Sequence, residues 1–335
     1  MPANHCRGCG DPLTEANDSA AHIIPNALGG RLDPTGIICR TCNTLLDTLA
    51  DNALVEAFGD WPTLLDIPRQ RGKNPPKLMQ TLSGQRVRMN ADGTSTRTDV
   101  QYDVEEIPEG HLVRIAAGEI KTFRQLLGRV TKQFPQVDAA EAERNARMGS
   151  LDDGDKIKVH LDFSPNAVFG GVITAVWLFL IYRTGHVFMT LTRLQGCIAE
   201  MRANGGTFRY FVDGLPGLRG PEIGLGHKII ARSVPGTGEL IVYVEILGIL
   251  RIGGVFAKSP VPALAMEHIY AFDLLGKTDR SSDFSIDAAE FDGQDWSRTG
   301  LGPTDAEALR EHFRGALDLF IDHYRNRFTS APPAA

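Results

Sequence analysis

The 335-residue chain lacks several features that would assign its class directly. It does not open with a basic segment followed by an apolar one, so we expect no secretion leader and a reducing, cytoplasmic location. It contains no internal repeat and no long low-complexity tract apart from a short "SAPPAA" tail, which argues against a repeat architecture. Apolar residues make up 42% of the chain, enough to build real cores.

No apolar run reaches the roughly 20 residues that a membrane-spanning helix needs. The longest run, from Ala167 to Tyr182, contains two glycines and follows Ser164-Pro165-Asn166, which is a favourable helix start in a soluble protein. We therefore expect a buried core helix here, in preference to a membrane segment, and no membrane partner.

The chain also lacks a basic excess, since its formal net charge is −6. This argues against coating of nucleic acid through overall charge. Acidic residues are absent between Ile67 and Ala91, however, where the charged residues are Arg69, Arg71, Lys73, Lys77, Arg86 and Arg88. This basic segment is either a solvated connector or a set of phosphate contacts, and the sequence leaves both interpretations open.

The pattern of the chain predicts an α+β fold in three parts. Residues 1–58 form a cysteine module that ends in a helix, residues 59–117 a proline-rich basic connector with a β-hairpin, and residues 118–330 an α+β domain for substrate recognition, regulation or assembly. Within the last part we expect an amphipathic helix over residues 120–134, two strands flanking residues 235–238 and a closing helix. The glycine-rich residues 214–226 lack the spacing of a phosphate-binding loop and predict a mobile surface loop.

Cysteine is scarce, and four of the five cysteines lie in two pairs, Cys6-x2-Cys9 and Cys39-x2-Cys42. In a reducing compartment such pairs are more typical of metal ligands than of disulfides. Two such knuckles can present four thiolates to one tetrahedral ion, for which Zn²⁺ is the best candidate. Because a closed four-thiolate site has no open coordination position, we expect a structural zinc. The fifth, Cys197, is expected to be a buried thiol without a chemical role.

The segment between the two cysteine pairs reads "AHIIPNALGG", and the second pair is followed at once by Asn43 and a helix. Cysteine pairs, His22, Gly29-Gly30 and "CN" in this order resemble the zinc-stapled branch of the HNH endonuclease family. The resemblance covers residues 6–58. It implies a small N-terminal zinc-bound ββα-metal module, followed here by a larger mixed α+β C-terminal region.

The resemblance also implies a set of functional residues. It makes His22 the general base that deprotonates a water for attack on a phosphodiester, a task that neutral imidazole suits near pH 7. Asn43 matches the family's metal-ligand position on the helix, and Asp47 lies one turn later on the same face. Oxygen ligands favour Mg²⁺ or Mn²⁺ as the catalytic ion. Asp47 is alternatively an ordinary surface acid.

Two positions depart from the family pattern. Ala21 stands where relatives commonly carry a metal ligand, and Asp33-Pro34-Thr35 stands where they commonly carry an asparagine. The two hypotheses are a metal-dependent HNH-type endonuclease and a non-catalytic zinc-knuckle module that binds nucleic acid or protein.

The nuclease hypothesis has double-stranded DNA as its substrate. Its arrangement resembles prokaryotic restriction or anti-phage nucleases, in which a second part reads a modified base or a nucleotide ligand. A homodimer would supply two active sites for two-strand cleavage.

Overall fold

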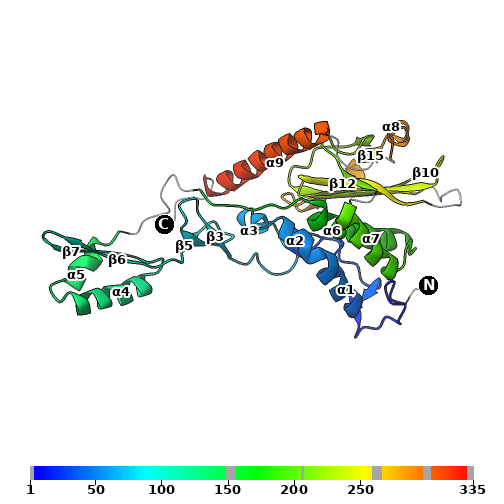
Figure 1. Ribbon diagram of the computed structural model, residues 1–335. Coiled ribbons are helices and arrows are strands. Elements are labelled where there is room, and N and C mark those ends of the chain that lie inside the picture. The colour runs from blue at the N-terminus through cyan, green and yellow to red at the C-terminus, as the bar shows by residue number, and fades with distance from the viewer. Residues whose placement is uncertain (1–3, 148–155, 205–206, 259–265, 297–302, 330–335) are drawn as a thin grey trace. The chain divides into compact units, whose positions relative to one another are not determined.

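The computed structural model describes residues 4–147, 156–204, 207–258, 266–296 and 303–329, and it has the mixed α+β composition that the sequence predicted (Figure 1). The chain divides into two compact units. Unit 1 consists of Met1–Lys73 and Leu161–Ala335, and unit 2 consists of Asn74–His160. Unit 2 is therefore inserted into the sequence of unit 1.

The boundaries between the two units lie after Lys73 and after His160. The sequence had predicted boundaries after residues 58 and 117. Residues 59–73 belong to unit 1, because Trp61, Leu65 and Ile67 are buried in its core. Helix α4 (Ile120–Gln133) belongs to the same unit as the strands before it, because it packs against β7 (Gly110–Ala116). The apolar side of an amphipathic helix needs such a cover, and the nearest strand supplies it.

The N-terminal module is built on short elements. Strand β1 (Asp18–Ser19) pairs antiparallel with β2 (Ile38–Cys39), which continues directly into α1 (Arg40–Leu46). The 3-10 helix η1 (Asn26–Leu28) lies between the strands. Ile23 and Ile24 are strand formers but lie outside any strand; Ile23 N–H donates to the Leu32 carbonyl at 2.9 Å, so the chain is paired only locally there.

The helix predicted after the second cysteine pair is present but contains a π-helical turn. Helix α1 passes into the π turn η2 (Asp47–Asp51) and then into α2 (Asn52–Ala57), with helical backbone angles at each junction. In this turn Arg202 of α7 (Leu191–Asn204) donates to the Leu49 carbonyl. Its guanidinium thus satisfies a backbone acceptor in the π turn.

The apolar run identified in the sequence forms α6 (Pro165–Thr184), in which every residue from Val168 to Ile181 is buried. By length and composition alone it is the one helix among the described residues that could cross a membrane, but 78% of its apolar window is buried inside the protein. It contacts α2 and η2 of the module, α7, and strands of the large sheet. A Cβ atom on Gly171 would lie 2.5 Å from Cβ of Leu54, so glycine permits the close approach of α2.

The large sheet of unit 1 has six antiparallel strands in the order β14-β13-β10-β11-β12-β8. Their bounds are β8 Phe208–Tyr210, β10 Gly226–Val234, β11 Glu239–Ile246, β12 Leu250–Lys258, β13 Glu267–Asp273 and β14 Thr278–Asp279. The predicted hairpin is confirmed, because Val234 pairs with Glu239 across the turn at residues 235–238. The strand after this turn, predicted over residues 239–250, ends at Ile246, because Leu247 and Gly248 take positive φ angles of 55° and 74° and turn the chain into β12.

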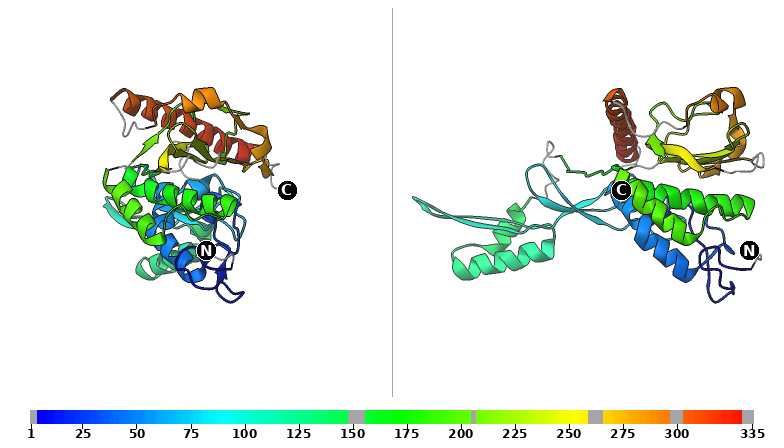
Figure 2. Two further views of the ribbon diagram at one scale, coloured as in Figure 1. Left: turned by 90° about the vertical axis from the view of Figure 1, so that its right-hand side faces the viewer. Right: turned by 45° about the vertical axis from the view of Figure 1, so that its right-hand side comes forward.

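Helices α6 and α7 lie between this sheet and the helices of the module (Figure 2). The opposite face of the sheet is covered by β9 (Leu218–Arg219), β15 (Ser285–Ile286) and α8 (Ala288–Asp292), with η3 (Ser281–Asp283) directly before β15. Helices α3 (Trp61–Leu64) and α9 (Pro303–Thr329) contribute Trp61 and Phe320 to the core that contains α6. The glycine-rich residues 214–226 were predicted to be a surface loop, which is wrong in part. Leu215, Ile223 and Leu225 are buried, because they cover apolar positions of the sheet.

Over its described residues, 74–147 and 156–160, unit 2 contains two small sheets and two helices. Strands β3 (Lys77–Gln80), β4 (Arg86–Met89) and β5 (Ser95–Arg97) form one antiparallel sheet, with the predicted turn at residues 91–93 between β4 and β5. Strands β6 (Gln101–Ile107) and β7 form a separate hairpin, followed by α4 and by α5 (Ala139–Asn145). The helix predicted over residues 120–134 is thereby confirmed.

Candidate functional site

The four paired cysteines converge at the base of the module. Their sulfur atoms all lie within 4.8 Å of one another, and the Sγ atoms of Cys9 and Cys39 are 3.8 Å apart. A tetrahedral zinc with Zn–S bonds of about 2.3 Å has sulfur–sulfur edges of about 3.8 Å. Gly8 leaves room for this cluster. A side chain at this position would clash with Cys42, since its Cβ atom would lie 2.7 Å from Sγ of Cys42. The cluster fits a zinc site, as the spacing predicted.

The environment of the sulfurs by itself favours the thiolate only at Cys6. Burial opposes ionisation of Cys6, but backbone N–H groups of Cys39, Cys9 and Gly8 outweigh it and lower the pKa of the Cys6 thiol to about 7. Burial raises the pKa of Cys9 to about 11, and burial with the neighbouring sulfurs raises that of Cys42. A divalent ion would offset both the desolvation and the mutual repulsion of the thiolates.

The candidate base His22 follows β1 in an irregular, half-buried segment. Burial lowers the pKa of His22, and the positive charge of Arg71 adds to this effect, while Asp33, Gln70 and Asp47 oppose it. The imidazole is therefore neutral near pH 7, which is the form that accepts a proton. Asp47 and His22 lie close enough to influence each other's pKa, so the structure brings these two predicted residues together.

The helix opposite His22 carries a pair of carboxyl groups. Burial raises the pKa of Asp47, against the opposing effects of a hydrogen bond with Asp51 and the charge of His22. Burial also raises the pKa of Asp51 well above its usual range, and the neighbouring Asp47 raises it further. Both effects make Asp51 the member of the pair that keeps its proton to the higher pH. The sequence analysis did not identify Asp51, although its spacing of four residues from Asp47 was a usable signal.

Asn43, the other predicted ligand on this helix, is half-buried in α1. The backbone N–H of Asp47 donates to the Asn43 carbonyl, which places the two residues one helical turn apart. Their side chains are thus neighbours on one side of the helix. Ala21, at the position of a common family ligand, is fully buried.

Gln70 and Asp33 are functional candidates that the sequence analysis did not assign. His22 Nε2 lies 3.2 Å from Gln70 Oε1, and Gln70 Nε2 donates to Asp33 Oδ1 at 3.0 Å. Asp33 also forms an ion pair of 2.7 Å with Arg71. Gln70 is a neutral residue 48 positions after His22, so no spacing rule could have identified it.

The structure divides the basic segment between the two units. Arg69, Arg71 and Lys73 belong to unit 1, where Arg69 donates to the Lys73 carbonyl and Arg71 to Asp33. The remaining residues of the set, Lys77, Arg86 and Arg88, lie in unit 2.

The basic residues of unit 2 lie on the two faces of the three-stranded sheet. Cross-strand pairing puts Arg86 opposite Gln80 and Arg88 opposite Leu78. These side chains share an exposed face, whereas Lys77 alternates to the face that contains the buried Met89. Arg86 and Arg88 therefore present their charges on the same surface of unit 2.

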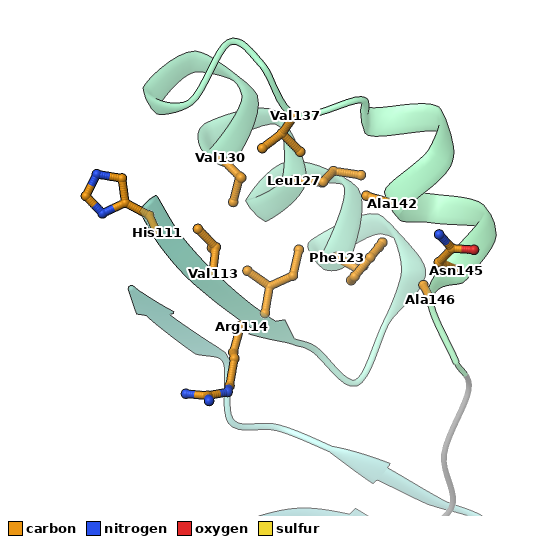
Figure 3. Close-up of a pocket in the computed structure, with 11 residues that line it drawn as sticks. His111, Val113, Arg114, Phe123, Leu127, Val130, Val137, Ala142, Asn145 and Ala146 are labelled. Atoms are coloured by element: carbon orange, nitrogen blue, oxygen red, sulfur yellow. The ribbon is translucent and has the colours of Figure 1, made fainter. Parts of the chain in front are cut away.

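Unit 2 also contains a pocket of about 480 Å³ (Figure 3). It lies between the β6–β7 hairpin and helices α4 and α5, across the predicted boundary at residue 117. The pocket is mainly apolar and is lined by His111, Val113, Arg114, Ile115, Phe123, Leu127, Val130, Val137, Ala142, Asn145 and Ala146. Arg114 is ion-paired with Glu105 at 2.8 Å. The lining suits an apolar or aromatic group better than a phosphate.

Comparison with known proteins identifies the N-terminal module. Residues 6–59 match the family model of the HNH endonucleases. This confirms the resemblance and its extent. No curated protein and no solved structure matches the chain.

The zinc site generates a prediction about stability. We expect the wild type to bind zinc, and Cys39→Ser to lose it and to lower the Tm of unit 1 by about 5–15 °C, since a few kcal/mol correspond to roughly 2–4 °C each in a unit of this size. Metal analysis and calorimetry measure both effects. Cys197→Ser is the matched control, because Cys197 lies outside the cluster. Zinc retained at full occupancy in Cys39→Ser would contradict the site.

The burial of His22 generates a prediction about its titration. A lowered pKa means that the ring stays neutral to a more acidic pH, so its titration midpoint should fall below the ordinary value of about 6.5. Arg71→Gln removes a positive charge near the ring and should move the midpoint upward. NMR titration of the ring measures both, with His22→Gln to assign the signal. A wild-type midpoint above 6.5 would contradict this environment.

Proposed function

We propose that the protein is a metal-dependent HNH-type endonuclease that hydrolyses phosphodiester bonds of nucleic acid, with double-stranded DNA as the substrate. One observation carries the proposal: within a module of the HNH family that has four clustered cysteines, a half-buried His22 with a lowered pKa lies close enough to Asp47 for their charges to interact. A general base and an oxygen ligand on facing elements are what phosphodiester hydrolysis requires.

In this proposal His22 accepts a proton from the attacking water. Asn43 and Asp47 fit a hard divalent ion, because an amide oxygen and a carboxylate one helical turn apart are oxygen donors of the kind that Mg²⁺ and Mn²⁺ prefer. Such an ion, when bound, stabilises the charge that develops on the phosphate and the leaving oxygen. Asp51 donates a hydrogen bond to Asp47 and so holds that carboxylate in place.

The substrate contacts of the proposal lie in both units. Arg86 and Arg88 share an exposed face in unit 2, and each has an acidic partner only at 3.9 Å, so both can approach phosphates. Lys77, on the other face of that sheet, and Lys73, in unit 1, are separate candidates for phosphate contacts. Arg69 and Arg71 bind groups of their own unit, so we assign them a smaller part in phosphate binding than the sequence suggested.

The wider setting is also a proposal. We infer a cytoplasmic restriction or anti-phage nuclease, because a compact nuclease module is joined to further domains that can select the substrate. The apolar pocket of unit 2 is the place for the base of a nucleotide or modified-base ligand. A homodimer would bring two active sites to a duplex, since one module carries one site.

A second function is favoured by Ala21. This residue is fully buried where relatives commonly hold a metal ligand, so the module has one oxygen donor fewer. The alternative is therefore a non-catalytic zinc module that binds nucleic acid or protein.

A plasmid-cleavage assay separates the two functions. With Mg²⁺ or Mn²⁺ the wild type should cut supercoiled plasmid, and His22→Ala should lower the rate by about 10²–10⁴-fold through loss of the base. Asn43→Ala should raise the metal concentration required. The controls are His186→Ala and Asn52→Ala, at exposed positions of the same unit. Full cleavage by His22→Ala would refute the site, and a wild type that retains DNA without cutting it would favour the binding function.

The exposed face of the β3–β4–β5 sheet generates a prediction about affinity. If Arg86 and Arg88 contact phosphates, replacing both by glutamine should reduce the slope of log affinity against log salt by about two, since each phosphate contact contributes about 0.9. Fluorescence anisotropy with a labelled duplex measures this slope. The control is Arg124→Gln in the same unit, where the arginine has a close acidic partner, Glu143. An unaltered slope removes Arg86 and Arg88 from the interface.

A further inference from the structure

The side chain that contacts the candidate base comes from outside the residues of the family match. Gln70 Oε1 lies 3.2 Å from His22 Nε2, whereas the match ends at residue 59. The chain thus returns to His22 after leaving the module. This contact belongs to unit 1, because both residues lie within Met1–Lys73.

The segment that carries Gln70 is held in place by Asn26, four residues after His22. The Oδ1 atom of Asn26 accepts from the backbone N–H of Gln70 at 2.8 Å and from that of Arg71 at 3.3 Å. Its Nδ2 atom donates to the Arg71 carbonyl at 2.9 Å. Arg31 adds a bond of 3.1 Å to the Pro68 carbonyl. The backbone of Gln70 is therefore fixed relative to the loop that carries His22.

Asp33 fixes the orientation of the Gln70 amide. Its Oδ2 atom pairs with Arg71 at 2.7 Å, and its Oδ1 atom accepts from Gln70 Nε2 at 3.0 Å. An ionised carboxylate can only accept hydrogen bonds, so the NH₂ group of Gln70 must face Asp33 and its oxygen must face the imidazole. Because this oxygen is also only an acceptor, Nε2 of His22 has to carry the proton. The lone pair is then on Nδ1.

We propose that Gln70, oriented by Asp33, is a positioning residue that holds His22 in the tautomer with a proton on Nε2 and the basic lone pair on Nδ1. This role adds a residue to the proposed nuclease site. Its importance for cleavage rests on the proposed nuclease function. A neutral amide suits this position, because it fixes the ring through one hydrogen bond without placing a full negative charge directly beside it. A carboxylate in direct contact would favour the protonated, non-basic imidazole more strongly.

The tautomer itself provides a test that does not depend on cleavage. In the full-length wild type with ¹⁵N-labelled histidine, the ring spectrum of His22 should show a protonated Nε2 and an unprotonated Nδ1. Gln70→Ala should give a mixture of both tautomers. Asp33→Asn should also give a mixture of both tautomers, although Gln70 is still present. An asparagine can present either its oxygen or its NH₂ group to Gln70, so it no longer fixes which end of the Gln70 amide faces His22. Gln125→Ala, an exposed glutamine of unit 2, should leave the spectrum unchanged.

Cleavage kinetics then show the consequence for the reaction. We expect Gln70→Ala to lower kcat on the order of tenfold with KM and zinc content unchanged, because part of the molecules hold the base in the wrong tautomer or orientation. A wild-type spectrum with the proton on Nδ1, or an unchanged spectrum in both Gln70→Ala and Asp33→Asn, overturns the proposal. Faster cleavage by Gln70→Ala also overturns it and identifies Gln70 as a block on His22. A wild type that cuts nothing refutes the nuclease function, whereas the ring spectrum still decides the role of Gln70.

Discussion

The convergence of four sulfur atoms is the constraint on which the N-terminal module depends. Its strands are two residues long and cannot hold the module together by their own hydrogen bonds. The cysteine pairs join the first turn of the chain to the start of α1, 30 residues later, and the loop that carries His22 is closed between them. A metal bound by these sulfurs would add its binding free energy to the apolar contacts that Ile23, Ile38 and Leu46 make in the core of unit 1.

Packing against the rest of unit 1 fixes the helix opposite His22. The approach of α2 to α6 at Gly171, and the bond from Arg202 to the π turn, hold this helix on the central apolar layer. The loop that carries His22 is held by the large sheet, because Nε2 of His227 in β10 lies at hydrogen-bond distance, 3.0 Å, from the Leu28 carbonyl. Burial lowers the pKa of His227 to about 4, so its imidazole is neutral in this hydrogen bond. The module is therefore anchored from two directions on the large sheet and its helices.

The electrostatics of the site keep the base neutral and the helix acidic. Burial lowers the pKa of His22 and outweighs the opposing charge of Asp33, a carboxylate that also accepts a hydrogen bond from the Gln70 amide beside the ring. On the helix, a proton shared from Asp51 to Asp47 leaves one negative charge on a pair of acids. In the proposed function, the candidate base His22 and the candidate metal ligand Asp47 are thereby kept in different charge states.

The sequence by itself determined the features that depend on short spacings. These are the cysteine pairs, the helix with Asn43 and Asp47 on one side, the core helix α6 and the hairpin turns, since each follows from local periodicity or turn chemistry. Only the tertiary structure decided that α4 belongs with the strands before it and that the basic segment is divided between two units. It also decided that Gln70 contacts both His22 and Asp33. These contacts join residues tens of positions apart and include a neutral side chain, so they depend on the path of the folded chain and leave no periodic signal in the sequence.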